Sequence, residues 1–228
     1  MSNGVKIHYV IQGKGDPVIL VHGLTSTSKL NWEMPGTIAE LAKHYRVIAF
    51  DNRGHGQSDK PEREDQYGVQ MVEDVVRLMD HLHITKAHVV GYSLGGMIAL
   101  KLLTLHPERL RSAVLGGMGW LKADSPFQHY WEEAKGRRTA KVPAACVRGI
   151  AKLAVTEDEV KAVRVPVTII VGERDPCRRL YVEPLVRVRP DWPEHVVQGA
   201  GHMNCILKPD FKTQIEAALD QGRPKRAH

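Results

Sequence analysis

The chain has 228 residues, a length that fits one globular domain with a core of ordinary size. Hydrophobic residues make up 43% and charged residues 25%, the balance of a soluble protein, and the longest apolar runs are too short to cross a bilayer. The formal net charge is +6, but no dense basic stripe with interleaved aromatic residues predicts nucleic-acid binding.

Short apolar runs rich in β-branched residues recur along the chain, bounded by Gly, Asp or Pro. They predict strands at residues 6–11, 18–21, 47–50, 87–90, 113–115, 167–171 and 195–197. Most of these runs are continuous rather than alternating, which is typical of strands buried on both faces of a parallel sheet.

Longer amphipathic stretches lie between these runs and predict helices. Residues 69–82 place their apolar side chains on one stripe, as in a helix with one buried face. Residues 95–106 are apolar nearly all round and end before Pro107, which cannot continue a helix. A last helix is expected at residues 209–219. The alternation predicts a doubly wound, mostly parallel α/β sheet in a single domain, residues 1–228.

The alternation breaks between residues 119 and 163, where no strong strand signal occurs. We interpret this segment as a short helical lid inserted over one end of the sheet. Its aromatic residues are Trp120, Phe127, Tyr130 and Trp131. They could line an apolar substrate pocket, or they could simply pack the lid onto the domain. A basic cluster follows at residues 135–141, and a solvated helix face explains it better than an anionic substrate does.

Residues 91–95 read Gly-Tyr-Ser-Leu-Gly, directly after one expected strand and directly before the apolar helix. A sharp strand-to-helix turn requires small residues two before and two after the nucleophile, and Gly91 and Gly95 meet that need. We therefore predict Ser93 as the nucleophile, with the backbone N–H of Leu94 aimed at a developing oxyanion. The alternative is a glycine-rich turn that merely joins strand to helix.

A serine hydroxyl needs a base within hydrogen-bond reach, and the base needs a third group to fix its tautomer. In this architecture the acid and then the histidine follow the serine, each on a loop after a strand. Asp175 and His202 occupy those positions, although they could instead be a helix N-cap and a surface histidine. Glu173 and Asp51 are competing acids.

Five sequence blocks occur in a fixed order: His22-Gly23-Leu24, then residues 51–59, 91–96 and 172–175, and finally Gly201-His202. Together they resemble the α/β-hydrolase superfamily, in particular its small esterase, haloperoxidase-like and enol-lactonase-like members, over roughly residues 4–219. The resemblance implies that Leu24 supplies the second oxyanion N–H, while His22 and Gly23 support its loop. It also implies that residues 51–59 form a structural turn.

Two departures from the family pattern are visible. The usual first strand is expected to be short or missing, and the 119–163 insertion is shorter than the usual lid. A short lid leaves a more open site.

The expected function is that of a serine esterase acting on small to medium acyl or aryl esters through an acyl-enzyme. No metal or organic cofactor is expected. A lactonase, a C–C bond hydrolase, a cofactor-free perhydrolase and a ligand receptor with a slow triad stay open as alternatives. A histidine base predicts that activity falls in acid, because a protonated imidazole cannot accept a proton.

The expected partner is a small-molecule substrate, and no membrane-spanning segment is expected. The sequence does not indicate an oligomeric state. No basic patch followed by an apolar stretch opens the chain, so a cytoplasmic location is expected. The odd, widely spaced cysteines Cys146, Cys177 and Cys205 are expected to be free thiols, although Cys177 and Cys205 could come near each other.

Overall fold

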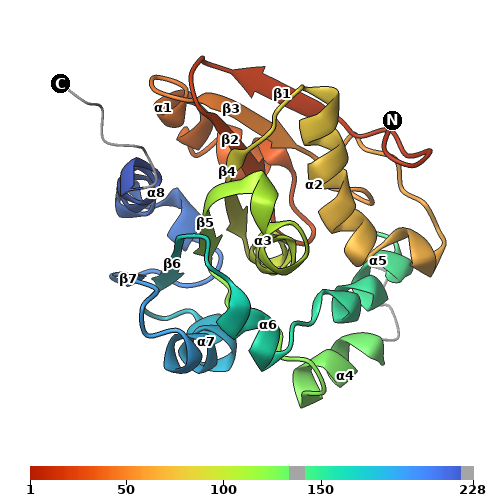
Figure 1. Cartoon of the computed structure of the whole chain (residues 1–228), viewed down its shortest axis with the longest axis vertical. Helices are drawn as coiled ribbons and strands as arrows, with labels where there is room; N and C mark the ends of the chain where they lie inside the picture. Colours follow the sequence, from red (N-terminus) through yellow and green to blue (C-terminus); the bar gives the residue numbers. More distant parts are fainter. Residues whose placement is uncertain (134–141, 222–228) are drawn as a thin grey trace.

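The structure is a computed structural model that describes residues 1–133 and 142–221. It contains a seven-stranded sheet in the order β1-β3-β2-β4-β5-β6-β7 (Figure 1). The strands are β1 (Tyr9–Gln12), β2 (Pro17–Val21), β3 (Arg46–Phe50), β4 (Ala87–Tyr92), β5 (Leu110–Gly116), β6 (Val167–Gly172) and β7 (Glu194–Val197). Neighbours pair in parallel except β1, which is antiparallel to β3. The predicted mostly parallel sheet is confirmed.

The central strands β4 and β6 are buried along their whole length, as their unbroken apolar sequences predict. The edge strand β1 begins at Tyr9 rather than at residue 6. Lys6 and His8 instead bond to the 51–59 turn, where Lys6 N–H donates to Asp59 Oδ2 at 2.7 Å and His8 N–H to Ser58 Oγ at 2.9 Å. Because the backbone N–H groups of Lys6 and His8 bond to side chains of this turn and not to β3, the strand begins only at Tyr9.

Helices cover both faces of the sheet. One face carries α1 (Thr37–Leu41) and α8 (Pro209–Gln221), whose buried residues form one apolar cluster with the sheet. The opposite face carries α2 (Val69–His81), α3 (Leu94–Leu105), α6 (Glu157–Ala162) and α7 (Glu183–Val188). The two apolar clusters make the sheet the middle of three layers.

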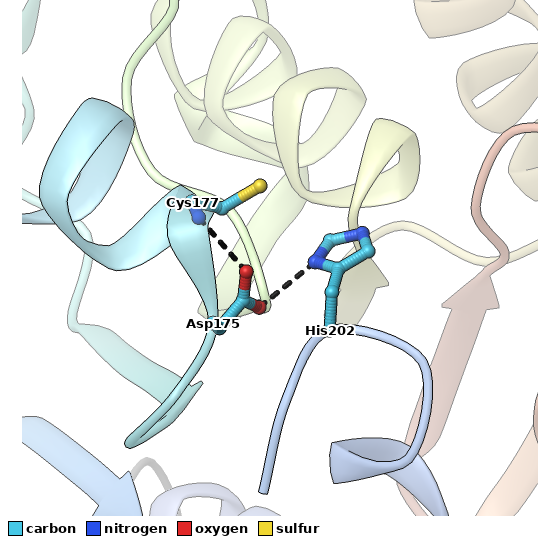
Figure 2. Close-up of side chains that lie close together, drawn as sticks. All are labelled: Asp175, Cys177 and His202. Carbon is cyan, nitrogen blue, oxygen red and sulfur yellow. Dashed lines mark hydrogen bonds and ion pairs between the residues drawn. The ribbon is translucent and has the colours of Figure 1, made fainter.

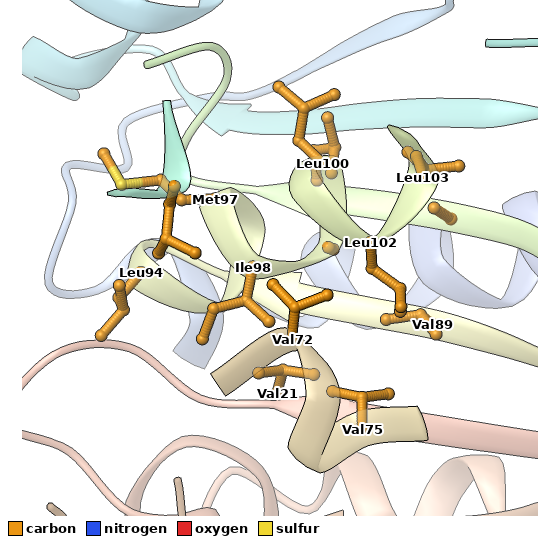
Figure 3. Packing of buried hydrophobic residues seen from close by; sticks show 14 of the residues in the cluster. Val21, Val72, Val75, Val89, Leu94, Met97, Ile98, Leu100, Leu102 and Leu103 are labelled. Atoms are coloured by element: carbon orange, nitrogen blue, oxygen red, sulfur yellow. The ribbon is translucent and has the colours of Figure 1, made fainter. Parts of the chain in front are cut away.

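The nearly all-round apolar character of α3 follows from its neighbours. Leu102 points toward Val89 of the sheet, and Ile98 faces Val72 of α2 (Figure 3). Each such aliphatic side chain contributes about 1.5–3 kcal/mol when it is buried fully. This packing fixes the position of α3 and therefore of Ser93, the residue that precedes its first turn.

The described part of the 119–163 segment contains the helices α4 (Pro126–Glu132), α5 (Ala144–Gly149) and α6, and an isolated β-bridge pairs Lys122 with Val155. Trp120 ties its start to its end, because the buried indole N–H donates to the carbonyl oxygen of Val155 at 2.7 Å. The basic cluster expected at 135–141 lies outside the described residues.

Several shorter turns complete the description. They are the π-helical η1 (Lys29–Glu33) and η5 (Arg178–Val182), and the 3₁₀ segments η2 (Glu64–Gln66), η3 (Pro107–Arg109), η4 (Ile150–Leu153) and η6 (Cys205–Leu207). Across the described ranges, none of the helices combines the length and the apolar character that a membrane crossing requires.

Candidate active site

Ser93 stands at the turn between β4 and α3 in a backbone conformation that non-glycine residues rarely adopt, with φ 55° and ψ −117°. Its N–H donates to the carbonyl oxygen of Gly116 at 2.7 Å, which holds the turn in place. A β carbon on Gly91 would lie 2.0 Å from the carbonyl oxygen of Gly95, so the turn tolerates only glycine there. The strained turn presents the Ser93 hydroxyl at the carboxyl edge of the sheet.

The structure brings the three predicted side chains together. His202 Nε2 lies 2.9 Å from Ser93 Oγ. On the other side of the ring, His202 Nδ1 lies 2.8 Å from Asp175 Oδ2, the contact drawn in Figure 2. Because a carboxylate can only accept, Nδ1 carries the proton and Nε2 is free to accept the hydroxyl proton. The Asp175 side chain is fully buried, whereas 26% of the His202 side chain is exposed.

Asp175 and His202 come from neighbouring loops that pack closely. Arg174 N–H donates to the carbonyl oxygen of Ala200 at 2.8 Å, joining the loop after β6 to the loop after β7. The second carboxylate oxygen of Asp175 accepts the backbone N–H of Cys177 at 2.8 Å. Both carboxylate oxygens therefore have an N–H donor, which fixes the plane of the group.

Tyr92, the last residue of β4, holds the loop that carries His202 against this strand. Its hydroxyl donates to the carbonyl oxygen of His202, and its ring centroid lies 5.6 Å from that of the imidazole. Burial raises the pKa of Tyr92, so the hydroxyl remains a donor at any physiological pH. The sequence analysis did not identify this residue, because nothing in the Gly-x-Ser-x-Gly pattern shows where the side chain before the serine points.

The His22–Leu24 loop lies against Ser93, since a β carbon on Gly23 would be 3.2 Å from Ser93 Cβ. Gly23 N–H donates to the side-chain oxygen of Asn31 at 2.8 Å. Leu94 is the first residue of α3, where backbone N–H groups have no partner inside the helix. The sequence analysis missed Asn31, which lies in η1 outside every motif.

His22 is a buried support of this loop. The backbone N–H of Asn52 donates to its Nε2 at 2.9 Å, so Nδ1 carries the proton and donates to the Gly23 carbonyl oxygen at 2.8 Å. Burial, with a smaller effect from the neighbouring His55 ring, lowers the pKa of His22 to about 3. The imidazole stays neutral and joins β2 to the 51–59 turn.

The competing acids have other partners. Asp51 accepts the Ser28 N–H and hydroxyl, each at 2.8 Å, and the Gln57 N–H at 2.9 Å. Glu173 accepts the Gly199 N–H at 2.9 Å. These carboxylates hold turns together.

The aromatic residues of the insertion differ in exposure. Trp120 is buried and Trp131 half-buried, whereas Phe127 is 36% and Tyr130 64% exposed. The Phe127 ring lies 5.2 Å from that of Tyr181. Trp120 therefore packs the insertion onto the domain, and a substrate-lining role for the other three stays a prediction.

All three cysteines are free thiols. Cys177 is half-buried beside Asp175, and both burial and that carboxylate raise the pKa of its thiol to about 12.

A family model described as alpha/beta hydrolase fold matches residues 16–144. A 2-hydroxymuconate semialdehyde hydrolase from Pseudomonas sp. (strain CF600) is 40% identical over 120 residues, which cover 51% of this chain and 41% of the relative. The matched part spans about two fifths to one half of such relatives.

Solved structures match over nearly the whole chain. A meta-cleavage product hydrolase from Pseudomonas fluorescens IP01 has a TM-score of 0.74 and 25% identity, covering 97% of each chain. A thermophilic esterase from Thermogutta terrifontis has a TM-score of 0.78 and covers 96% of this chain and 95% of its own; at 23% identity it shows the fold alone.

Proposed function

The chain belongs to the α/β-hydrolase family, and on that premise we propose that it is a serine hydrolase that cleaves carboxylic esters of small to medium acyl or aryl groups. The observation that carries the proposal is the continuous hydrogen-bonded chain from Ser93 Oγ through the His202 imidazole to the Asp175 carboxylate. A strained serine, a neutral imidazole acceptor and a buried carboxylate are the parts that acyl transfer requires.

In the first half of the reaction, Ser93 Oγ attacks the ester carbonyl carbon while its proton moves to His202 Nε2. The carbonyl electron pair collects on oxygen, where the N–H groups of Leu24 and Leu94 stabilise it. Each such donor contributes about 3 kcal/mol in well-studied enzymes. Asp175 stabilises the imidazolium, since its negative charge lies against Nδ1–H.

His202 then gives its proton to the leaving alcohol as the carbon–oxygen bond breaks, which leaves the acyl group on Ser93. Water attacks this acyl-enzyme and passes its proton to His202 Nε2. Collapse of the second tetrahedral intermediate releases the acid and returns the proton to Ser93. No net proton is left on the enzyme.

The test combines p-nitrophenyl esters of graded acyl length with fluorophosphonate labelling. We expect Ser93→Ala to abolish labelling and to lower kcat by at least about 10⁴-fold, with a similar loss for His202→Asn. His83→Asn is the matched control, because His83 is exposed just after α2 and should leave both readouts unchanged. A wild-type protein that neither takes the label nor cleaves any ester would favour the ligand-receptor alternative.

A second candidate is hydrolysis of a carbon–carbon bond, which the same nucleophile and base could begin. What favours it is the 40% identity to a protein named as a 2-hydroxymuconate semialdehyde hydrolase. That semialdehyde and a set of lactones belong in the same assay panel. A kcat/KM higher for the semialdehyde than for every ester would replace the ester proposal with this one.

A further inference from the structure

The acid–base pair of the site has a third neighbour that ester hydrolysis does not use. Asp175, Cys177 and His202 each offer a carboxylate oxygen, a sulfur or a ring nitrogen, and these atoms all lie within 4.8 Å of one another. Figure 2 shows the thiol at the start of the helical turn that follows Asp175, on the side where the His202 ring lies.

We propose that Asp175, Cys177 and His202 form a binding site for a soft divalent cation such as Zn²⁺, and that its occupation reversibly stops hydrolysis. This inhibition rests on the proposed function, because it acts through the base of that reaction. The cation is a regulator here and takes no part in the chemistry.

The donor set determines which cation fits. Thiolate, imidazole and carboxylate together are ligands of Zn²⁺ or Cd²⁺, whereas Mg²⁺ and Ca²⁺ prefer sites made of oxygen alone. Tetrahedral Zn²⁺ holds such donors about 3.5 Å apart. The widest of the three separations, at most 4.8 Å, must therefore shorten by up to about 1 Å, and a fourth position stays open for water.

The burial of the three residues allows this closure. Asp175 is fixed, since its side chain is fully buried and one of its oxygens accepts the Cys177 N–H. Cys177 and His202 are both partly exposed, so their side chains can adjust their positions around Asp175 and the cation can enter from solvent.

Occupation removes the base whichever imidazole nitrogen binds. A cation on Nε2 takes the lone pair that would accept the Ser93 proton. A cation on Nδ1 takes the place of the proton that now bonds to Asp175, and that proton moves to Nε2, which then has no lone pair for the Ser93 proton. The Cys177 thiol releases its proton to solvent as the metal–sulfur bond forms.

Binding is measured first without any substrate. CdCl₂ is titrated into the wild type, Ser93→Ala, Cys177→Ser and Cys146→Ser, and the ultraviolet cadmium–thiolate absorption is recorded. We expect a saturable band with one equivalent of Cd²⁺ in the wild type and in Ser93→Ala, and loss of that band in Cys177→Ser. Cys146→Ser is the matched control, because Cys146 is a buried free cysteine in α5 and should leave the band intact.

Inhibition is measured second, as the ratio of ester-hydrolysis rates with and without ZnCl₂ in the wild type, Cys177→Ser and Cys146→Ser. We expect EDTA to restore wild-type activity, and the half-inhibitory Zn²⁺ concentration to rise at least about tenfold in Cys177→Ser. Thermal melts of Cys177→Ser and Cys177→Ala verify that both variants fold.

Two results would overturn the site: no thiolate band in the wild type, or an equal band in Cys177→Ser, which would place the cation on another thiol. Equal Zn²⁺ inhibition of wild type and Cys177→Ser would overturn the regulatory part. The Ser93→Ala titration needs no hydrolysis, so a failure of the proposed function and a failure of the metal site give different results.

Discussion

Asp175 accepts two N–H hydrogen bonds at once, one on each carboxylate oxygen. Cys177 N–H lies 2.8 Å from Oδ1, and the ring N–H of His202 lies 2.8 Å from Oδ2. An asparagine in the same place has one acceptor oxygen, so its NH₂ group must face one of these donors. When the NH₂ group faces the His202 ring, the contact between two donors is avoided if the imidazole proton moves from Nδ1 to Nε2. Nε2 then cannot accept a proton from Ser93.

Asp175→Asn is therefore expected to lower kcat by about 10⁴-fold while the protein stays folded, because the substitution keeps the shape but reverses the tautomer. Steady-state kinetics and a urea unfolding curve measure the two effects separately. Asp158→Asn, on an exposed position of α6, is the matched control and should retain full activity. Activity within tenfold of wild type in Asp175→Asn would exclude Asp175 as the orienting acid.

At the scale of elements, the first turn of α3 passes very close to the end of β2. A β carbon on Gly95 would lie 2.0 Å from the carbonyl oxygen of Val21, a backbone atom that cannot rotate away. A β carbon on the next residue, Gly96, would lie 3.2 Å from Met118 Cβ, a contact that small shifts relieve. The helix can approach the strand only where Gly95 stands.

These adjacent glycines make a matched pair. We expect Gly95→Ala to lower the free energy of unfolding by more than about 3 kcal/mol, or to prevent folding, because the clash is with main chain. Gly96→Ala should change it by no more than about 1 kcal/mol, since better helix propensity offsets a mild contact. Urea unfolding of both variants decides, and similar stabilities would contradict the close approach.

At the scale of the whole molecule, buried polar groups hold the turn at residues 51–59 against α2 and against the end of β2. Arg53, fully buried, donates two hydrogen bonds of 2.6 Å to Asp74 of α2. His22 and His55 lie beside this turn with ring centroids 5.1 Å apart, and burial lowers the pKa of both. Two neutral imidazoles are thus part of the folded state.

Their lowered pKa values make stability depend on pH. Below about 6.5 the unfolded chain protonates both histidines, whereas folded His22 stays neutral to about pH 3. The unfolded state therefore binds more protons, and stability falls with falling pH by up to about 1.4 kcal/mol per unit for each histidine. Urea unfolding at pH 7, 6 and 5 should show this decline, with a smaller slope in His22→Asn and an unchanged slope in His83→Asn. A wild-type profile that is flat over this range would refute it.

The sequence by itself determined the strand order along the chain, the long helices and the three separated residues that meet at one edge of the sheet. Continuous β-branched runs reveal buried parallel strands because both faces need apolar side chains, and such strands carry Ser93, Asp175 and His202 on the loops at their carboxyl ends. Helices of five or six residues, such as α1 and α7, are too short to show a helical period, and they were not predicted.

Only the tertiary structure decided which groups surround those three residues. Three contacts depend on the paths of loops: the hydrogen bond from Gly23 N–H to Asn31, the Tyr92 hydroxyl on the His202 carbonyl oxygen, and the Cys177 thiol beside Asp175 and His202. Loop paths are set by contacts between segments far apart in the chain, and a local pattern of residue types does not predict those contacts. The same reason explains why Trp120 is buried while Tyr130 of the same segment faces solvent.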